Sequence, residues 1–320
     1  MMNGLKIYIT IVCLLFSSVC TAKKKQSTLP EIKRVQTSFV IDADSGKVLH
    51  DVNGAHRIYP ASLTKLMTLY LAFEALQSNK MSINDELVVS RNAENMKPSK
   101  IGLKAGETIT AKNAILALIV KSANDAAVVI AEALAKDEKS FAQKMTRRAH
   151  QLGMKNSHFY NASGWHHPEQ KTTASDLAKL TMAIKRDFPE FYPWFSKDQF
   201  VYNGRTIMGH NKVARTYPGA EGMKTGYTSP AGFNLVTTAL RNGKRLIGVV
   251  TGSPAAATRD AKMKKLLDVH FANLGVTNNV FESQSAKNNI SKKASRIGSK
   301  NTKKTIGHKK INKSAKTLRV

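Results

Sequence analysis

Two apolar, β-rich runs joined by a tight turn are the feature that most restricts what this chain can fold into. The runs cover residues 233–240 and 245–251, and Asn242-Gly243 lies between them. Asn-Gly is the strongest short signal for a β-hairpin, because both residues readily adopt the positive φ that such a turn requires. The sequence therefore predicts an antiparallel sheet that contains this hairpin.

The remaining apolar patterns predict a second hairpin and a set of helices. Residues 37–41 and 47–50 are expected as strands around the turn Asp44-Ser45-Gly46. Apolar residues at helical spacing predict helices over 60–79, 111–134 with a break at 121–125, 141–152, 173–185 and 256–274. This order predicts an α+β fold: one antiparallel sheet with its first and last helices on a face, and an all-helical cluster inserted between the strands.

Charge is distributed unevenly along the chain. The 320 residues are 42% hydrophobic, which excludes a wholly disordered or collagen-like protein, and 50 Lys+Arg against 22 Asp+Glu give a net charge of +28. Twelve basic residues fall in 281–320, where Glu282 is the one acid, so we expect 279–320 to be a disordered basic tail. No aromatic residue follows Phe281 to stack on bases, which argues against nucleic acid as the partner. An anionic membrane or envelope surface is one expected partner of the tail, and a purely solvated tail is the alternative.

The first 22 residues have the features of a secretory signal. Lys6 precedes the apolar run 7–16, and a small-residue segment ends at Ala22, after which we expect cleavage. The alternative, a retained membrane anchor, would need about 20 apolar residues. Both cysteines, Cys13 and Cys20, fall in this segment, so the exported chain would contain no disulfide. The expected organisation is a signal at 1–22, a linker at 23–36, a folded domain at 37–278 and the tail, with the protein in the periplasm or on the outer face of the cytoplasmic membrane.

Ser62 and Lys65 are the first candidates for chemistry. In Ser62-Leu63-Thr64-Lys65 they lie one helical turn apart on the same face, at a predicted helix N-terminus. A serine hydroxyl becomes a nucleophile when a neighbouring base takes its proton, and a lysine kept neutral by burial can be that base. The alternative is a helix-capping serine beside an exposed lysine.

Two further short patterns follow in the chain. Ser122-Ala123-Asn124 interrupts an apolar helical run, where its side chains could face a cleft. Lys224-Thr225-Gly226 occurs once; Lys and Thr can hold a carboxylate, and a strand that begins with a glycine-containing segment can pair with a peptide. Taken alone, Ser-x-Asn is a very weak signal, because it also appears at Ser82, Ser90 and Ser299. Lys-Thr-Gly alone would more often be a turn into a hairpin.

The order Ser-x-x-Lys, Ser-x-Asn, Lys-Thr-Gly resembles the signature of penicillin-binding proteins and serine β-lactamases. The surrounding residues 60–68, 122–126 and 222–228, together with 161–164, resemble the low-molecular-mass D-alanyl-D-alanine carboxypeptidases over 37–274. The resemblance implies a β-lactamase-like fold and a serine carboxypeptidase that removes the terminal D-alanine from peptidoglycan stem peptides, binds penicillin and needs no metal or other cofactor.

The resemblance also implies roles for individual residues. Ser62 would be the nucleophile and Lys65 the base, with Ser122 and Asn124 as proton relay and positioning groups. The terminal carboxylate would be bound by Lys224 and Thr225 in the Lys-Thr-Gly226 strand, and the oxyanion would be held by the backbone N–H groups of Ser62 and Tyr227. Arg259 falls where this family places an arginine at the carboxylate end; its alternative is a structural pairing around Asp260.

Some features depart from the family or leave other functions open. Many members continue into a β-rich domain and an amphipathic anchor helix, whereas this chain has a Lys-rich segment after Phe281. An endopeptidase acting on cross-links would use the same residues. A class A β-lactamase is disfavoured because Ala123 replaces the aspartate of Ser-Asp-Asn, and a zinc peptidase because no His-Glu-x-x-His occurs and His166-His167 are adjacent. A non-catalytic basic protein that binds the envelope is the remaining alternative.

Overall fold

The computed structural model describes residues 34–276. The predicted signal at 1–22, most of the linker at 23–36 and the tail at 279–320 lie outside these residues. Within the described part, no helix is long and apolar enough to cross a membrane.

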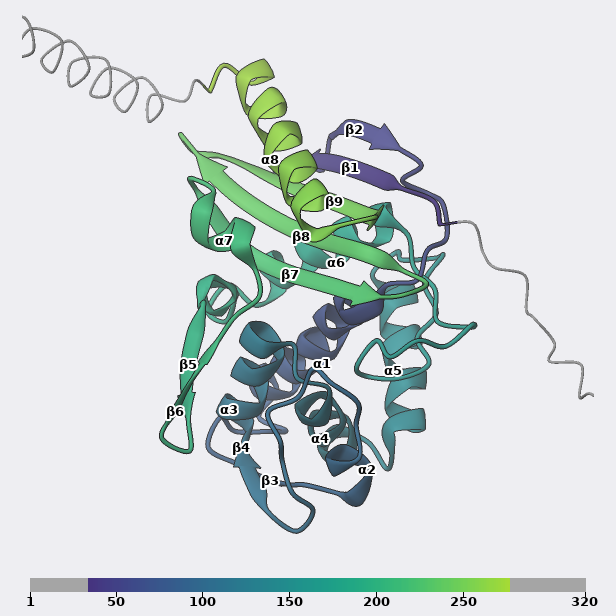
Figure 1. Cartoon of the computed structure of the whole chain (residues 1–320), viewed down its shortest axis with the longest axis vertical. Coiled ribbons are helices and arrows are strands. Elements are labelled where there is room, and N and C mark those ends of the chain that lie inside the picture. The colour runs from purple at the N-terminus through teal and green to yellow at the C-terminus, as the bar shows by residue number, and fades with distance from the viewer. Residues whose placement is uncertain (1–33, 277–320) are drawn as a thin grey trace, which may run out of the picture. The chain divides into compact units, whose positions relative to one another are not determined.

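A five-stranded antiparallel sheet is the largest sheet of the described residues (Figure 1). Its strand order is β2-β1-β9-β8-β7, which brings the first and the last strands of the chain together at its centre. The strands are β1 (Thr37–Asp42), β2 (Val48–Val52), β7 (Ala220–Thr228), β8 (Gly232–Arg241) and β9 (Lys244–Ser253). The predicted Asn-Gly hairpin is confirmed: Asn242 and Gly243 both have positive φ and connect β8 to β9.

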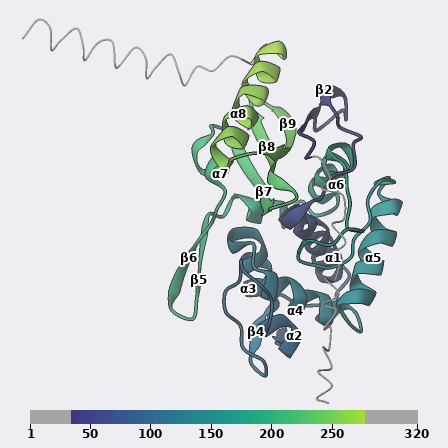
Figure 2. The ribbon, with the colours of Figure 1, turned by 45° about the vertical axis from the view of Figure 1, so that its right-hand side comes forward.

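The two faces of the sheet are covered by different helices (Figures 1 and 2). On one face, α8 (Ala256–Asn273) packs Met263, Leu267 and Phe271 against apolar side chains of β1, β8 and β9. Strand residues of opposite parity point to the other face, where they join the core that contains α6 (Ala174–Asp187) and α1 (Lys65–Gln77). The expectation that the first and last helices share a face is therefore wrong.

The segment between β2 and β7 is mainly helical. Besides α1 and α6 it contains α2 (Arg91–Glu94), α3 (Ala111–Leu116), α4 (Asn124–Leu134), α5 (Glu138–Gln151) and α7 (Lys212–Thr216). It also contains the short turns η1 (Ala61–Thr64), η2 (Ala117–Lys121) and η3 (Tyr192–Ser196). Two small antiparallel pairs, β3 (Glu86–Val88) with β4 (Thr108–Thr110) and β5 (Gln199–Tyr202) with β6 (Arg205–Met208), show that the insert is not all-helical as expected.

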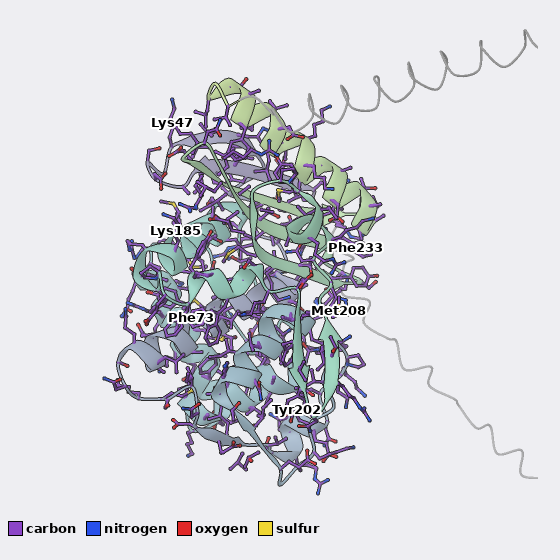
Figure 3. All side chains as sticks on the ribbon, turned by 90° about the vertical axis from the view of Figure 1, so that its left-hand side faces the viewer. Lys47, Phe73, Lys185, Tyr202, Met208 and Phe233 are labelled. Carbon is purple, nitrogen blue, oxygen red and sulfur yellow. The ribbon has the colours of Figure 1, made fainter. Side chains whose placement is uncertain are left out.

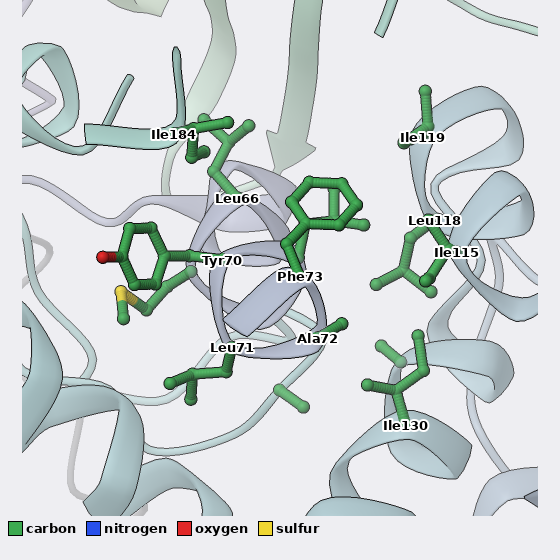
Figure 4. Packing of buried hydrophobic residues seen from close by; sticks show 14 of the residues in the cluster. Leu66, Tyr70, Leu71, Ala72, Phe73, Ile115, Leu118, Ile119, Ile130 and Ile184 are labelled. Atoms are coloured by element: carbon green, nitrogen blue, oxygen red, sulfur yellow. The ribbon is translucent and has the colours of Figure 1, made fainter. Parts of the chain in front are cut away.

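Helix α1 is the buried axis of this helical part (Figure 4). Eleven of its 13 residues are buried, and Phe73 contacts Phe188, Phe191 and Phe195 through its ring. Figure 4 shows Ile115, Leu118 and Ile130 facing it from neighbouring helices. Because other elements surround α1, this packing fixes the position of its first residue, Lys65.

Candidate functional site

A cleft of about 520 Å³ lies where η1, the start of α4, the edge strand β7 and the start of α8 meet. Seven of the nine predicted site residues line it: Ser62, Ser122, Asn124, Thr225, Gly226, Tyr227 and Arg259. The other two, Lys65 and Lys224, are 0% and 2% exposed and lie beneath its wall. The structure thus brings residues separated by almost 200 positions into one site.

Ser62 lies in a 3₁₀ turn rather than in the predicted α-helix. The turn η1 covers Ala61–Thr64, and the α-helix begins at Lys65. Lys65 Nζ is 3.2 Å from Ser62 Oγ, so the hydroxyl and the amine are within hydrogen-bond distance. Ser62 is partly exposed to the cleft, whereas Lys65 has no exposed surface.

The hydrogen bonds of Lys65 fit a neutral amine. Its Nζ donates to Asn124 Oδ1 at 2.7 Å and to the Ser163 carbonyl. The Asn124 amide group is oriented by its own donation to the Lys97 carbonyl at 2.8 Å. A neutral amine has two hydrogens and one lone pair, and these two acceptors use both hydrogens. The lone pair is then available to the Ser62 hydroxyl, as a general base requires.

Burial favours this neutral form. Complete removal from water lowers the pKa of Lys65 well below its usual value, and the nearby charge of Lys224 lowers it further. The carboxylates of Asp125 and Glu138 act in the opposite direction but do not outweigh burial.

Ser122 occupies a break in the helical run 111–134. The run consists of α3, one π-turn (η2) and α4, and Ser122 connects the last two with a φ of 60°. This left-handed conformation is unfavourable for a residue with a side chain and is characteristic of functional sites. Its buried Oγ has no hydrogen-bond partner within residues 34–276, although it lines the cleft.

Asp125 was not among the predicted site residues. It holds the 99–103 loop, which faces Ser122. Its buried carboxylate accepts hydrogen bonds from the backbone N–H groups of Ile101, Gly102 and Leu103. The same loop is joined to the motif by Asn124 N, which donates to the Ser99 carbonyl at 2.7 Å. Asn124 and Asp125, at the start of α4, therefore hold in place the loop that forms the wall of the cleft opposite β7.

Strand β7 approaches the nucleophile turn closely at Gly226. A Cβ at this position would lie 3.1 Å from Ser62 N and 3.2 Å from Leu63 N, so a side chain would push the two elements apart. The strand begins at Ala220, four residues before the predicted start, and is an edge of the sheet. Half of the backbone groups of an edge strand face away from its partner and can pair with an extended ligand.

Lys224 and Arg259 place positive charge at the cleft. Lys224 Nζ donates to the Thr225 carbonyl at 3.1 Å, and burial together with the charge of Arg259 lowers its pKa to about 7. Arg259 lines the cleft and is 5% exposed, but its Nε and Nη2 both donate to Asp260 Oδ1. Arg259 therefore pairs with Asp260 and also lines the cleft, so it has both features that were expected of it.

Asn234 connects the sheet to the nucleophile turn. It is fully buried in β8, donates to the Tyr59 and Pro60 carbonyls at 3.2 and 3.3 Å, and accepts from Gly252 N at 2.9 Å. A polar residue inside an apolar strand is the sequence signal that could have identified it.

The segment 162–164 supports the nucleophile turn from the other side. A Cβ on Gly164 would lie 1.9 Å from the Ala61 carbonyl oxygen, so only glycine fits there. The Ser163 carbonyl accepts from Lys65, and Ala162 N donates to Glu138 Oε1 at 3.0 Å. Residues 161–164 were part of the family resemblance, whereas Glu138 was not among the predicted site residues.

Histidines do not form a metal centre in residues 34–276, where no group of three or more His, Cys, Asp or Glu side chains is arranged to hold an ion. His166 and His167 lie in a loop, where they contact the rings of Tyr59 and Tyr160. His210, which the sequence analysis also missed, lines the cleft; burial and the charges of Lys121 and Lys224 lower its pKa.

Comparisons with known proteins agree with this arrangement. The chain is 35% identical over 283 residues to a D-alanyl-D-alanine carboxypeptidase, DacA, of Haemophilus influenzae, covering 87% of this chain and 70% of that protein. It is similar to the crystal structure of penicillin binding protein 5 from Haemophilus influenzae, with a TM-score of 0.72 and 35% identity, over 75% of this chain and 71% of the other. It is also similar to penicillin-binding protein D2 from Listeria monocytogenes in its cefotaxime-bound form, with a TM-score of 0.67 and 30% identity, over 73% and 96% of the two chains. The pattern of the D-alanyl-D-alanine carboxypeptidase family matches residues 23–255, and the chain belongs to this family.

Proposed function

We propose that this protein is a serine-type D-alanyl-D-alanine carboxypeptidase that removes the terminal D-alanine from peptidoglycan stem peptides through an acyl-enzyme at Ser62. The observation that carries the proposal is the Ser62–Lys65 pair, 3.2 Å apart at a cleft that is also lined by Ser122, Asn124 and Thr225. Family membership supplies the bond that is broken.

Acylation would begin with transfer of the Ser62 proton to Lys65 as Oγ attacks the carbonyl carbon of the penultimate D-alanine. The negative charge that develops on the carbonyl oxygen would be stabilised by the backbone N–H groups of Ser62 and Tyr227. The support is the close approach of β7 to Ser62 N at Gly226, the residue before Tyr227. The leaving amine would receive its proton from Lys65 through Ser122, which lines the cleft and whose hydroxyl has no hydrogen-bond partner within residues 34–276. Water then hydrolyses the ester, with Lys65 again as the base.

The terminal carboxylate would be held at the other side of the reacting bond. Thr225 and Arg259 line the cleft and can contact it directly. Lys224 lies beneath them, so its contribution is electrostatic attraction through the wall. A carboxylate in this position orients the scissile bond over Ser62, and this is the basis of specificity for a C-terminal residue.

A β-lactam would acylate the same serine. The Listeria relative has been crystallised in a cefotaxime-bound form. In a β-lactam the amine produced by ring opening stays attached to the acyl group. It therefore does not leave the site as D-alanine does, and the ester is expected to persist.

The proposal is tested by measuring D-alanine release from a purified pentapeptide that ends in D-Ala-D-Ala, with Ser62→Ala as the control. Wild-type protein should release D-alanine and Ser62→Ala should not. Cleavage of a cross-linked dimer without D-alanine release from the pentapeptide would indicate an endopeptidase, and many turnovers of a chromogenic cephalosporin would indicate a β-lactamase. The absence of all three activities would indicate a protein that only binds the envelope.

We also propose that the protein is exported, that the folded domain covers residues 37–278, and that the Lys-rich tail at 279–320 associates with an anionic membrane or envelope surface. The support is the sequence pattern at each end of the chain. A chain truncated after Glu282 should keep its D-alanine release and lose sedimentation with anionic lipid vesicles, whereas equal sedimentation of both chains would contradict the role of the tail.

A further inference from the structure

A second groove begins where the catalytic cleft ends. Its volume is also about 520 Å³, and it lies between the 100–107 loop and the β5–β6 hairpin. The two linings contain neighbouring residues of the chain: Ser99 and Ser122 line the cleft, and Lys100 and Lys121 line the groove. In Figure 3, Tyr202 and Met208 of the groove follow Phe233 of the cleft along the same side of the protein.

Both walls of the groove are fixed to the elements that carry Ser122 and Asn124. The loop wall is held by the three backbone N–H groups that donate to Asp125. The hairpin wall packs against η2 at Gly209, where a Cβ would lie 2.9 Å from the Asp198 carbonyl oxygen and 3.3 Å from that of Val120. The groove therefore extends the site and has a defined position relative to the nucleophile, Ser62.

The groove is strongly cationic. Lys100, Lys104, Lys121 and Arg205 line it against one acid, Glu107, which gives a net charge of 4 − 1 = +3. Lys104 is 3.5 Å from Glu94, whereas Lys121 and Arg205 have no ion-pair partner within residues 34–276. The positive charge also continues into the cleft, because Lys121 and Lys224 both act on His210.

We infer that this groove is a carboxylate-binding subsite for the part of the substrate peptide that lies outside the terminal D-Ala-D-Ala. The inference rests on the proposed function. Unpaired lysine and arginine side chains in an open, polar groove attract carboxylates, and the guanidinium of Arg205 can bind one with two parallel hydrogen bonds. The carboxylates can come from residues that precede the dipeptide in the same strand, or from a second strand joined to it by a cross-link.

The test uses the full chain with two of the exposed groove cations reversed, Lys104→Glu with Arg205→Glu. The control for charge reversal is Lys47→Glu, which reverses one exposed lysine in the β1–β2 turn. Hydrolysis is measured on an acylated tripeptide with no carboxylate except its C-terminus, on a linear pentapeptide with free upstream carboxylates, on the same pentapeptide with those carboxylates amidated, and on a cross-linked dimer.

The double variant should raise KM about tenfold for a carboxylate-bearing substrate and leave the tripeptide and the amidated pentapeptide unchanged. A loss on both the free pentapeptide and the dimer would identify the same strand as the source, and a loss confined to the dimer would identify the second strand. Equal changes on all four substrates, no change on any, or the same change in Lys47→Glu would overturn the inference. Failure of the proposed function is seen separately, as absence of tripeptide hydrolysis by the wild-type protein.

Discussion

Replacement of Gly164 by alanine should displace the nucleophile turn, and it should slow the reaction more than it lowers the stability of the fold. Gly164 has a φ of +83°, and an added Cβ would lie 1.9 Å from the Ala61 carbonyl oxygen. Real Cβ atoms essentially never come closer than 3.0 Å, so the two backbones must separate by at least 3.0 − 1.9 = 1.1 Å. This movement displaces η1, which carries Ser62, from the segment whose Ser163 carbonyl accepts from Lys65.

The expected effect on the reaction is larger than the effect on folding. A displacement of about 1 Å at reacting groups costs about 100-fold in rate. The positive φ costs a further ~1–2 kcal/mol of stability for a residue with a side chain. Gly153 provides the matched control, because it has a φ of +80° and nothing within 4 Å of an added Cβ.

The assay is the rate of acylation by a fluorescent penicillin, together with the free energy of unfolding in denaturant. Gly164→Ala should acylate about 100-fold more slowly than wild type, whereas Gly153→Ala should lose only ~1–2 kcal/mol of stability and acylate normally. If Gly164→Ala acylates within about threefold of Gly153→Ala, the claim that the 162–164 segment positions Ser62 and Lys65 is refuted.

Three further predictions concern groups around the site. Glu138→Gln keeps an acceptor for Ala162 N and should acylate within about threefold of wild type, whereas Glu138→Ala should be about tenfold slower; equal rates would exclude a positioning role for Glu138. Asp125→Ala leaves three backbone N–H groups without their acceptor and should cost ~2–4 kcal/mol in denaturant unfolding, and a loss below ~1 kcal/mol would show that the 101–103 loop does not depend on this carboxylate. The pKa of Lys224 is about 7 in the folded protein and ordinarily 10.5, so between these values the unfolded chain binds a proton that the folded protein lacks. The stability that Lys224 contributes must then rise with pH over this window, and the Tm of wild type should rise relative to that of Lys224→Met from about pH 7 to 9; parallel Tm curves would contradict the shift.

Local signals were sufficient to predict the parts of the fold that depend on short-range chemistry. The turn at Asn242-Gly243 adopts the positive φ values that the dipeptide favours. The same signal was present at Asn203-Gly204, which connects β5 to β6 with φ values of 48° and 71°, but the sequence analysis did not use it. That omission explains why the β5–β6 pair was not expected.

Other features could not be predicted because their partners are distant in the chain. Asn234 contacts Tyr59 across 175 positions, and Glu138 contacts Ala162 across 24. The face of the sheet on which α1 lies is set by how the helical insert packs, and periodicity within the helix carries no information about it. The break at 121–125 was visible as a loss of helical pattern, but its π-turn and left-handed Ser122 follow from backbone hydrogen bonding.

Most residues of the candidate site could be predicted from the sequence, because its three motifs follow one another in a fixed order. Seven of the predicted residues line one cleft, which spacing alone could not establish. The burial of Lys65 was expected only as the condition for its role as a base, and that of Lys224 was not predicted, since exposure depends on the surrounding helices and strands. This burial accounts for the lowered pKa of each lysine.

Peptide mapping by mass spectrometry after exposure to a β-lactam tests the central claim most directly. The account predicts one covalent adduct, on the peptide that contains Ser62, with unmodified protein in Ser62→Ala and much slower labelling in Lys65→Ala. An adduct on any other serine, or no adduct on correctly folded wild-type protein, would contradict it.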